Sequence, residues 1–454
     1  MELFGTAGIR GPVDETVTPE LALAVGRAVG RDATEVVLGR DGRVTGPGLA
    51  AALEAGITSA GADVRRLGVV PTAALAFAAR GRRGIMVTAS HNPPEDNGLK
   101  CFVDGREYDR ESERRVEARV DERDSVVPWS DWGTRREGSV LDAYRGAIRQ
   151  YAAGHGARAE GLVVAVDCGN GTGSLATPQV LSDPGAEVQA LNANVDGHFP
   201  GRQSKPTPES IRDLRDFVAA GPAELGFAHD GDADRIVVVG PDGEVVHEDT
   251  VLAVLAEHFV RRAATPDPVV VTTPNASGRI DERVAAAGGR VERVRLGALH
   301  EGTTRVRSRG SEGTAVVFAA EPWKHVHPDL GPWIDGIASA AVLTRLVGET
   351  SLRELTEPVD ERPYRKVSVD CPDEAKGAAM TTLEETLPEA YPDASVETEY
   401  GVRLSLPDGG WTLVRPSGTE SYLRIYAESE RVDDLVVTVR GLVEDAVDEA
   451  RAAA

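Results

Sequence analysis

The sequence predicts three similar α/β units followed by a smaller α+β unit, on three observations. Apolar runs of strand length alternate with helical stretches through most of the chain. The order of strand, glycine turn and helix starts again at 161–181 and at 267–289. From Arg362 onward the pattern changes to strand, helix and hairpin. Continuous apolar strands between helices are typical of buried parallel sheets, so we expect layered α/β units.

The expected elements of the three α/β units follow in chain order. In the first unit, 35–41 and 84–89 are strands, and 48–62 is a helix between them. A strand, a glycine turn and a helix share 161–181 in the second unit, and the same elements share 267–289 in the third. Charged segments at 120–133 and 356–366 are expected to be linkers. We therefore place the domains at 1–147, 148–250, 251–361 and 362–454.

The last domain has the pattern of an α+β fold. A helix is expected at 373–388, and the "PDGG" of 407–410 between two strand runs predicts a hairpin. Apolar residues recur at helical spacing from Leu435 through Val439 to Ala450, which predicts a final helix.

Composition excludes several classes of protein. Seventy-three acidic residues against fifty basic ones give a formal net charge of −23, which repels nucleic acid and anionic membranes. Only five of the basic residues are lysines, and we interpret this acidic, lysine-poor surface as an adaptation to high salt. Full stability at low ionic strength would count against that hypothesis. Three scattered cysteines, no apolar leader and no long apolar run predict a cytoplasmic protein without disulfides.

The stretch "HDGDADR" at 229–235 predicts a metal site. Asp230, Asp232 and Asp234 alternate after a strand-like run, and alternate side chains of an extended segment share a face. Three close carboxylates need a cation, and oxygen ligands suit Mg²⁺. A solvated acidic turn and a phosphatase with a nucleophilic aspartate are the alternatives. An EF-hand is disfavoured because Arg235 and Pro241 occupy its glycine and glutamate positions.

Two further loops carry candidate binding residues. "RPSGTE" at 415–420 offers a guanidinium, two hydroxyls and a glycine, a set that suits a phosphate dianion. The alternative is a turn with an exposed arginine. In "AAEPWKHVH" at 319–327, Glu321 could accept bonds from sugar hydroxyls, Trp323 could stack on a sugar, and His325 could move a proton. Taken alone, this loop is equally compatible with an ordinary surface loop.

The stretch "GIMVTASHNPPEDNGLK" at 84–100 places Ser90 just after a buried strand, where a rigid scaffold would hold its hydroxyl. The neighbouring His91 suggests a hydrolase, but adjacent side chains rarely face each other and no G-x-S-x-G elbow is present. Lys100 could neutralise a phosphate or donate a proton. Standing alone, the motif would indicate a turn serine.

Taken together, four stretches identify a family. "FGTAGIRG", "TASHNPPEDNGLK", "DGDADR" and "RPSGTE" occur in the order and at about the spacing of the α-D-phosphohexomutases, which include phosphoglucomutases, phosphomannomutases and phosphoglucosamine mutases. The chain resembles a halophilic archaeal member. The resemblance implies three mixed-sheet α/β domains and a smaller α+β domain, heart-shaped around a central cleft that collects one loop from each domain.

The resemblance also implies roles for individual residues. Ser90 resembles the phosphorylated serine, and its phosphate oxygen would complete a Mg²⁺ site made by Asp230, Asp232 and Asp234. The implied groups around the transferring phosphoryl are Arg10, Lys100 and Arg235, with Lys100 and His325 as acid/base candidates. The implied phosphate site consists of Arg415, Ser417, Gly418 and Thr419. We assign substrate binding to Glu321, Trp323, Lys324 and His91.

The implied activity is an intramolecular phosphotransfer between hexose 1-phosphate and hexose 6-phosphate, through phosphoserine and a bisphosphate that also acts as activator. The sugar loop departs from the usual G-E-x-S-G-H at Ala320, Trp323 and Lys324, so glucosamine, mannose and glucose all remain open. A phosphopentomutase, a Mg²⁺-dependent sugar-phosphate phosphatase and an inactive sugar-phosphate sensor are the alternatives. The expected partners are small sugar phosphates, without nucleic acid or membrane, and the oligomeric state is open.

Overall fold

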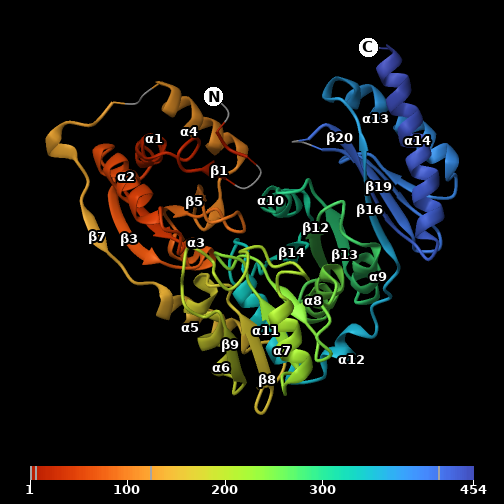
Figure 1. Cartoon of the computed structure of the whole chain (residues 1–454), viewed down its shortest axis with the longest axis horizontal. Coiled ribbons are helices and arrows are strands. Elements are labelled where there is room, and N and C mark those ends of the chain that lie inside the picture. The colour runs from red at the N-terminus through yellow and green to blue at the C-terminus, as the bar shows by residue number, and fades with distance from the viewer. Residues whose placement is uncertain (1–2, 6–7, 123–124, 418–419, 454) are drawn as a thin grey trace. The chain divides into compact units, whose positions relative to one another are not determined.

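The computed structural model describes residues 3–5, 8–122, 125–417 and 420–453. The chain divides into two compact units, labelled by element in Figure 1. The first unit is formed by Met1–Val251 with Phe318–Thr356, and the second by Leu252–Val317 with Glu357–Ala454. Among the described residues there are four sheets, and one falls inside each of the four predicted domains. The domain boundaries themselves stay a prediction.

The first sheet belongs to the first unit. Its strand order is β1 (Ile9–Pro12), β5 (Asp96–Val103), β4 (Arg83–Val87), β2 (Glu35–Arg40), β3 (Asp63–Val69) and β7 (Arg135–Glu137), with β6 (Arg106–Glu107) paired to β5. Its helices are α1 (Pro19–Gly30), α2 (Gly46–Ser59), α3 (Thr72–Ala78) and α4 (Arg110–Glu122), followed by η1 (Trp129–Asp131) and α5 (Leu141–Ala152).

Both faces of this sheet are covered, and strand alternation decides which side chain faces which layer. Leu99 and Cys101 of β5 join the apolar cluster that the sheet forms with α1, α2 and α4. Lys100 lies between them and therefore points to the opposite face. That face packs on α3, since a Cβ on Gly39 would come within 2.9 Å of Leu75. A buried lysine thus reaches the side of the sheet where α3 begins.

The second sheet also lies in the first unit. Its order is β11 (Val237–Val239), β10 (Leu225–Ala228), β8 (Val163–Asp167) and β9 (Glu187–Leu191). The accompanying helices are η2 (Thr172–Leu175), α6 (Thr177–Ser182) and α7 (Arg212–Ala220). Leu214 and Val218 of α7 pack on Ala165, Ala228 and the strand residues around them.

The third sheet has the order β13 (Arg290–Arg293), β12 (Asp267–Thr272), β14 (Thr314–Glu321) and β15 (Lys324–Val326). The chain passes from the second unit into the first within β14, so β15, α11 (Gly336–Val347) and α12 (Leu352–Thr356) belong to the first unit. In the first unit, α11 packs on α5 and α6. The remaining helices of this region are α8 (Glu248–Arg262), α9 (Gly278–Ala286) and α10 (Leu299–Arg309).

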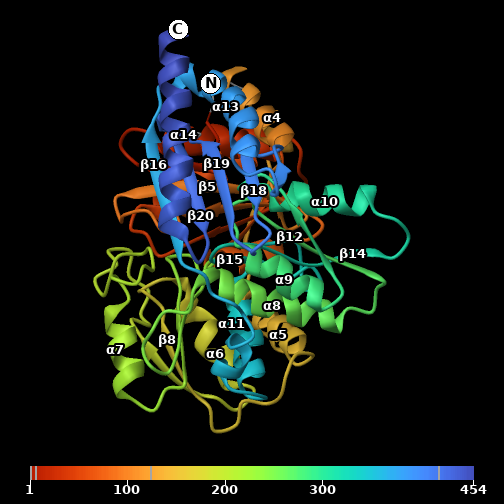
Figure 2. The same ribbon diagram turned by 90° about the vertical axis from the view of Figure 1, so that its right-hand side faces the viewer.

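The fourth sheet, in the second unit, is antiparallel throughout, and its order is β16 (Tyr364–Asp370), β20 (Tyr422–Glu428), β19 (Trp411–Pro416), β18 (Val402–Ser405) and β17 (Ser395–Glu397). Val414, Leu423 and Ile425 face the helices α13 (Asp373–Ala390) and α14 (Val432–Ala453), which cover one side in Figure 2. Alternation places Arg415 and Arg424, which are opposite each other, on the other side.

The predicted fold class, mixed α/β sheets with a C-terminal α+β domain, is confirmed, with two corrections of detail. The pattern suggested parallel sheets, but β4 pairs parallel with β2 and antiparallel with β5. The expected linker at 120–133 starts inside α4 and bonds to the end of α2 through Val127 N–H and Gly133 N–H. Among the described helices, none combines the length and the apolar character that crossing a membrane requires.

Candidate active site

Ser90 lies in the serine loop (88–95), which joins the antiparallel strands β4 and β5. Its side chain is fully buried, and its backbone has φ +51°, a left-handed conformation that is uncommon for residues other than glycine. The hydroxyl donates a 2.6 Å hydrogen bond to Asp230 Oδ2. Residues 140 positions apart in the chain are therefore in direct contact, as the sequence predicts.

The three aspartates converge because the chain turns, which corrects the extended geometry expected from the sequence. The aspartate turn (229–236) joins β10 to β11, with Ala233 at φ +59°. Asp230, Asp232 and Asp234 are buried, and one carboxylate oxygen of each lies within 4.8 Å of the others. Asp232 Oδ1 and Asp234 Oδ1 are buried without a hydrogen-bond partner among the described residues. These oxygen donors fit a hard divalent cation such as Mg²⁺.

Cations surround this carboxylate cluster. Lys100 Nζ lies 2.7 Å from Asp234 Oδ2 and 3.4 Å from Asp232 Oδ2. Arg235 Nε is 3.8 Å from Asp230 Oδ2. Arg10 belongs to β1, next to β5, and acts electrostatically on both Lys100 and His91. The structure thus brings Ser90, the aspartates and all three predicted cations into one unit.

The net effect of burial and the neighbouring charges is to raise the pKa values of both Asp230 and Lys100. Burial, together with the carboxylates of Asp234 and Asp232, raises the pKa of Asp230. Burial alone would lower the pKa of Lys100, but Asp232 and Asp234 outweigh it and raise that pKa above its usual value. Lys100 is consequently a fixed cation at neutral pH.

The sugar hairpin (320–325) is the tight connection between β14 and β15, where Ala320 pairs with His325 and Glu321 with Lys324. It is attached to the aspartate turn by backbone contacts. Ile236 N–H donates to Trp323 O at 3.1 Å, and an isolated antiparallel β-bridge pairs Lys324 with Arg235. Lys324 Nζ lies 3.8 Å from Glu321 Oε2, and both side chains are partly exposed. The hairpin therefore presents a cation and a carboxylate close to the aspartates.

In this hairpin, the side chains of Trp323 and His325 both pack against other parts of the protein. Trp323 packs against the apolar cluster of the second sheet, so part of its ring is occupied by protein. His325 is 1% exposed, and its Nδ1 lies 2.9 Å from Ser339 Oγ in α11. Burial lowers the pKa of His325 to about 3, so the ring is neutral. The substrate role of Trp323 and the acid/base role of His325 stay predictions.

His91 is nearer to the serine than sequence adjacency suggested, since its Nδ1 lies 3.4 Å from Ser90 Oγ. Burial, helped by Arg235 and Arg10, lowers the pKa of His91 to about 3. The ring is therefore neutral and partly exposed at the serine.

The arginine loop (415–421), which comprises the end of β19 and the connection to β20, belongs to the second unit. Arg415 Nη2 donates to Tyr426 OH at 3.1 Å, and its buried Nε has no hydrogen-bond partner among the described residues. Ser417 Oγ accepts from Glu420 N–H at 3.1 Å. The predicted residues Gly418 and Thr419 lie outside the described part of the chain. Arg424, opposite Arg415, adds a second guanidinium to this face.

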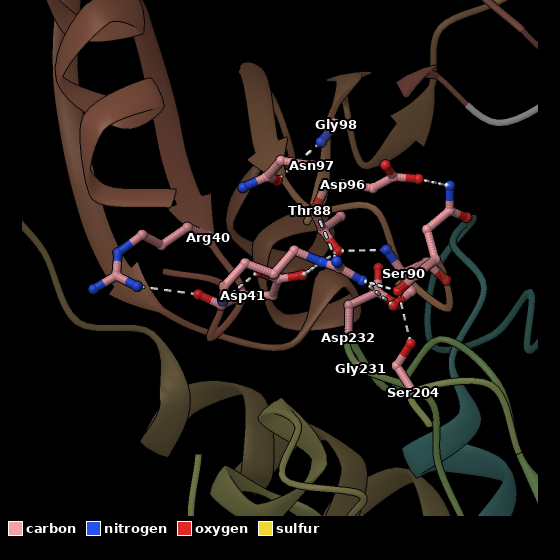
Figure 3. A network of polar contacts seen from close by, with 12 residues as sticks. Arg40, Asp41, Thr88, Ser90, Asp96, Asn97, Gly98, Ser204, Gly231 and Asp232 are labelled. Atoms are coloured by element: carbon pink, nitrogen blue, oxygen red, sulfur yellow. Dashed lines mark hydrogen bonds and ion pairs between the residues drawn. The ribbon is translucent and has the colours of Figure 1, made fainter. Parts of the chain in front are cut away.

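Several buried polar residues that support the site were not predicted from the sequence, and Figure 3 labels Asp41 and Thr88 among them. Asp41 and Arg43 follow β2 in "GRDGR" and are fully buried, and Arg43 donates to four carbonyl groups of the serine loop and β5. Thr72 at the start of α3 donates to Asp232 Oδ2 at 2.6 Å. A charged cluster directly after a buried strand was the available signal for Asp41 and Arg43.

Comparison with known proteins defines the class. The chain matches the phosphoglucomutase/phosphomannomutase family in its alpha/beta/alpha domain I over residues 1–127, domain II over 142–243 and C-terminal domain over 367–442. The chain belongs to this family, the α-D-phosphohexomutases. It is an isomerase of the phosphohexomutase type.

Individual relatives extend over the whole chain. A protein of Thermococcus kodakarensis named phosphopentomutase is 40% identical over 99% of both chains. One of Methanopyrus kandleri named "Probable phosphoglucosamine mutase" is 41% identical over 97% of this chain and 98% of its own. The solved structure of a phosphoglucomutase/phosphomannomutase family protein from Burkholderia thailandensis has a TM-score of 0.85 at 26% identity and covers 99% of this chain and 98% of its own.

Proposed function

We propose that this chain transfers a phosphoryl group between Ser90 and a hexose phosphate, and so interconverts the 1-phosphate and the 6-phosphate through a bisphosphate. The observation that carries the proposal is the 2.6 Å contact between Ser90 Oγ and Asp230, a member of the buried aspartate cluster. In a phosphatase with a nucleophilic aspartate, Ser90 would be a bystander, and this contact would have no purpose.

Asp230, Asp232 and Asp234 would hold Mg²⁺, with an oxygen of phosphorylated Ser90 as a further ligand. The bound ion would neutralise charge on the transferring phosphoryl group. Lys100, Arg235 and Arg10 add fixed positive charge at the same place, and such preorganised charge stabilises the transition state. The raised pKa of Lys100 favours this electrostatic role over proton transfer.

In the first half-reaction, a sugar hydroxyl attacks phosphorus while the bond from phosphorus to Ser90 Oγ breaks. The hydroxyl proton passes to a neutral base, for which His91 and His325 are the candidates. In the second half-reaction the other phosphoryl group returns to Ser90, and the proton returns to the sugar oxygen that is released. Arg415, Ser417, Gly418 and Thr419 would bind the phosphate that is not reacting.

A panel of sugar phosphates tests the activity. The protein is incubated with Mg²⁺, a trace of sugar bisphosphate and the 1-phosphates of glucosamine, mannose, glucose and ribose, and products are separated by anion exchange. We expect a hexose 6-phosphate, loss of activity in EDTA and its return with Mg²⁺. Free phosphate as the product would identify a phosphatase, and binding without turnover would identify a sensor.

A pentose phosphate is the second candidate substrate class, on two specific observations. The Thermococcus kodakarensis relative carries the name phosphopentomutase at 40% identity. The sugar hairpin also replaces the small residues of the usual motif with Ala320, Trp323 and Lys324. Preferential conversion of ribose 1-phosphate in the same panel would decide for this candidate.

A further inference from the structure

The backbone of Ser90 is held on both sides by one buried ion pair. Arg43 Nε lies 3.1 Å from Asp41 Oδ2, and neither side chain is exposed. Arg43 N–H also donates to Asp41 Oδ1 at 2.9 Å, so the carboxylate is bound at both oxygens. This pair follows β2, the strand next to β4, and therefore lies beside the start of the serine loop.

The carbonyl side of Ser90 is held by Arg43 itself. Arg43 Nη2 donates to Ser90 O at 3.0 Å and to Asn92 O at 2.7 Å. Its Nη1 donates to Asp96 O at 2.8 Å and also contacts Pro93 O. One planar guanidinium thus donates hydrogen bonds to carbonyl groups before and after the two prolines of the loop.

The amide side of Ser90 is held through Thr88. Ser90 N–H donates to Thr88 Oγ1 at 2.8 Å, and that hydroxyl donates its proton to Asp41 Oδ2 at 2.7 Å. Figure 3 shows these contacts converging on Ser90. Both backbone polar groups of Ser90 are therefore fixed by the same Asp41 and Arg43.

Ser90 is held in a backbone conformation that serine rarely adopts. A non-glycine residue in the left-handed region persists only where its surroundings over-determine it. The aspartate turn packs closely against this backbone, because a Cβ on Gly231 would lie 2.7 Å from Ser90 O. If Ser90 relaxed to negative φ, its side chain would leave Asp230.

We propose that Asp41, Thr88 and Arg43 form a serine clamp, a set of positioning residues that holds Ser90 in its left-handed conformation and aims Oγ at the aspartate cluster. The clamp rests on the proposed role of Ser90 as phosphoryl carrier. It acts on the phosphoryl-transfer steps and not on sugar binding, since none of its side chains is exposed.

Two variants test the clamp. Thr88→Val keeps the shape of the side chain but removes the hydroxyl between Ser90 N–H and Asp41. Arg43→Lys keeps the charge but loses the planar set of donors. Because a small displacement of a reacting atom is costly, we expect kcat to fall about 100-fold with KM changed by less than about threefold. The rate at which a sugar bisphosphate phosphorylates Ser90, measured by mass spectrometry of the intact protein, should fall by a similar factor.

Matched controls separate positioning from general stability. Thr344→Val removes a buried hydroxyl that donates to Ala340 O, and Arg279→Lys alters a buried arginine paired with Glu428. Both controls should keep kcat within about twofold, because the residues they change lie outside the Ser90 contacts.

Hydrogen exchange gives a readout that does not need turnover. Peptides covering 84–100 should exchange about tenfold faster in Thr88→Val than in wild type, with the aspartate turn unchanged. Unchanged exchange in this peptide, or kcat for both clamp variants within twofold of their controls, would overturn the clamp. Failure of the wild-type protein to convert any sugar phosphate would instead refute the proposed function, while the exchange result would still decide the clamp.

Discussion

The serine loop and the arginine loop are connections of the same kind that are anchored differently. Each joins two antiparallel strands and carries a residue for which we propose a role in phosphate chemistry. The serine loop bonds to a fully buried ion pair. In the described part of the arginine loop, the chain bonds to Lys376 Nζ through Ser417 O at 2.9 Å and Glu420 O at 2.7 Å, and that lysine is paired with an exposed aspartate. Ser90, the proposed phosphoryl carrier, is thus held from inside the protein, whereas the proposed phosphate site of the arginine loop is held at the surface.

The largest expected effect is on turnover at the serine loop. Ser90→Ala removes the hydroxyl that we propose carries the phosphoryl group, so we expect kcat to fall by several orders of magnitude, on the order of 10³-fold or more, while the fold is kept. Isomerisation measured with saturating substrate checks this, with circular dichroism as the control. Turnover near that of wild type would refute the role of Ser90, and the two loops would then differ in their anchoring alone.

The anchors themselves should differ in their contribution to stability. Arg43→Met leaves the buried Asp41 without its charge partner and four carbonyl groups without their donor, so we expect a loss of about 3–5 kcal/mol in the free energy of unfolding. Lys376→Met removes bonds to two carbonyl groups near solvent, and a loss of about 1 kcal/mol is expected. Urea denaturation of both variants measures the difference. Equal losses would mean that the two loops are anchored to a similar extent.

Asp335 lies outside both loops, in the first unit, and should make the free energy of unfolding depend on pH. Burial raises the pKa of Asp335 to about 6, although Tyr144, Trp333 and Ala338 donate hydrogen bonds to it. The folded state therefore favours the protonated form, and stability falls as the pH rises from about 4, near the unfolded pKa, through about 6.

The loss of stability attributable to Asp335 should be about 2–3 kcal/mol across this window and should level off above it. Asp335→Asn should lack this part of the pH dependence, which urea denaturation between pH 4 and 7 would measure. A variant whose stability follows the wild-type profile in parallel would contradict the assignment.

The smallest effect on catalysis is expected at the arginine loop. Arg415→Gln should raise KM by about 10-fold with little change in kcat, because a phosphate contact that persists throughout the reaction is lost equally from the ground state and the transition state. Steady-state kinetics check this, with Arg365→Gln, an exposed arginine paired with Asp433, as the control. A fall in kcat at unchanged KM would show that the arginine loop takes part in the chemical step.

Much of the candidate site could be predicted from local sequence. Ser90 follows an apolar strand, the aspartates follow another, and each motif carries its donor types within a few residues. The aspartate cluster was predicted for a partly wrong reason, since a turn with Ala233 at positive φ, and not an extended segment, brings the carboxylates together. The residue types were informative even though the local conformation was not.

The sequence by itself determined which donors exist and on which strands they lie, because apolar periodicity and short motifs are local properties of the chain. Tertiary structure alone decided that Lys100 is a fixed cation, since its charge state depends on carboxylates more than 130 positions away. It also decided that Trp323 packs on an apolar cluster and that Arg43 holds the serine loop. Electrostatic and packing energies depend on distance in space, and a single sequence gives only distance along the chain.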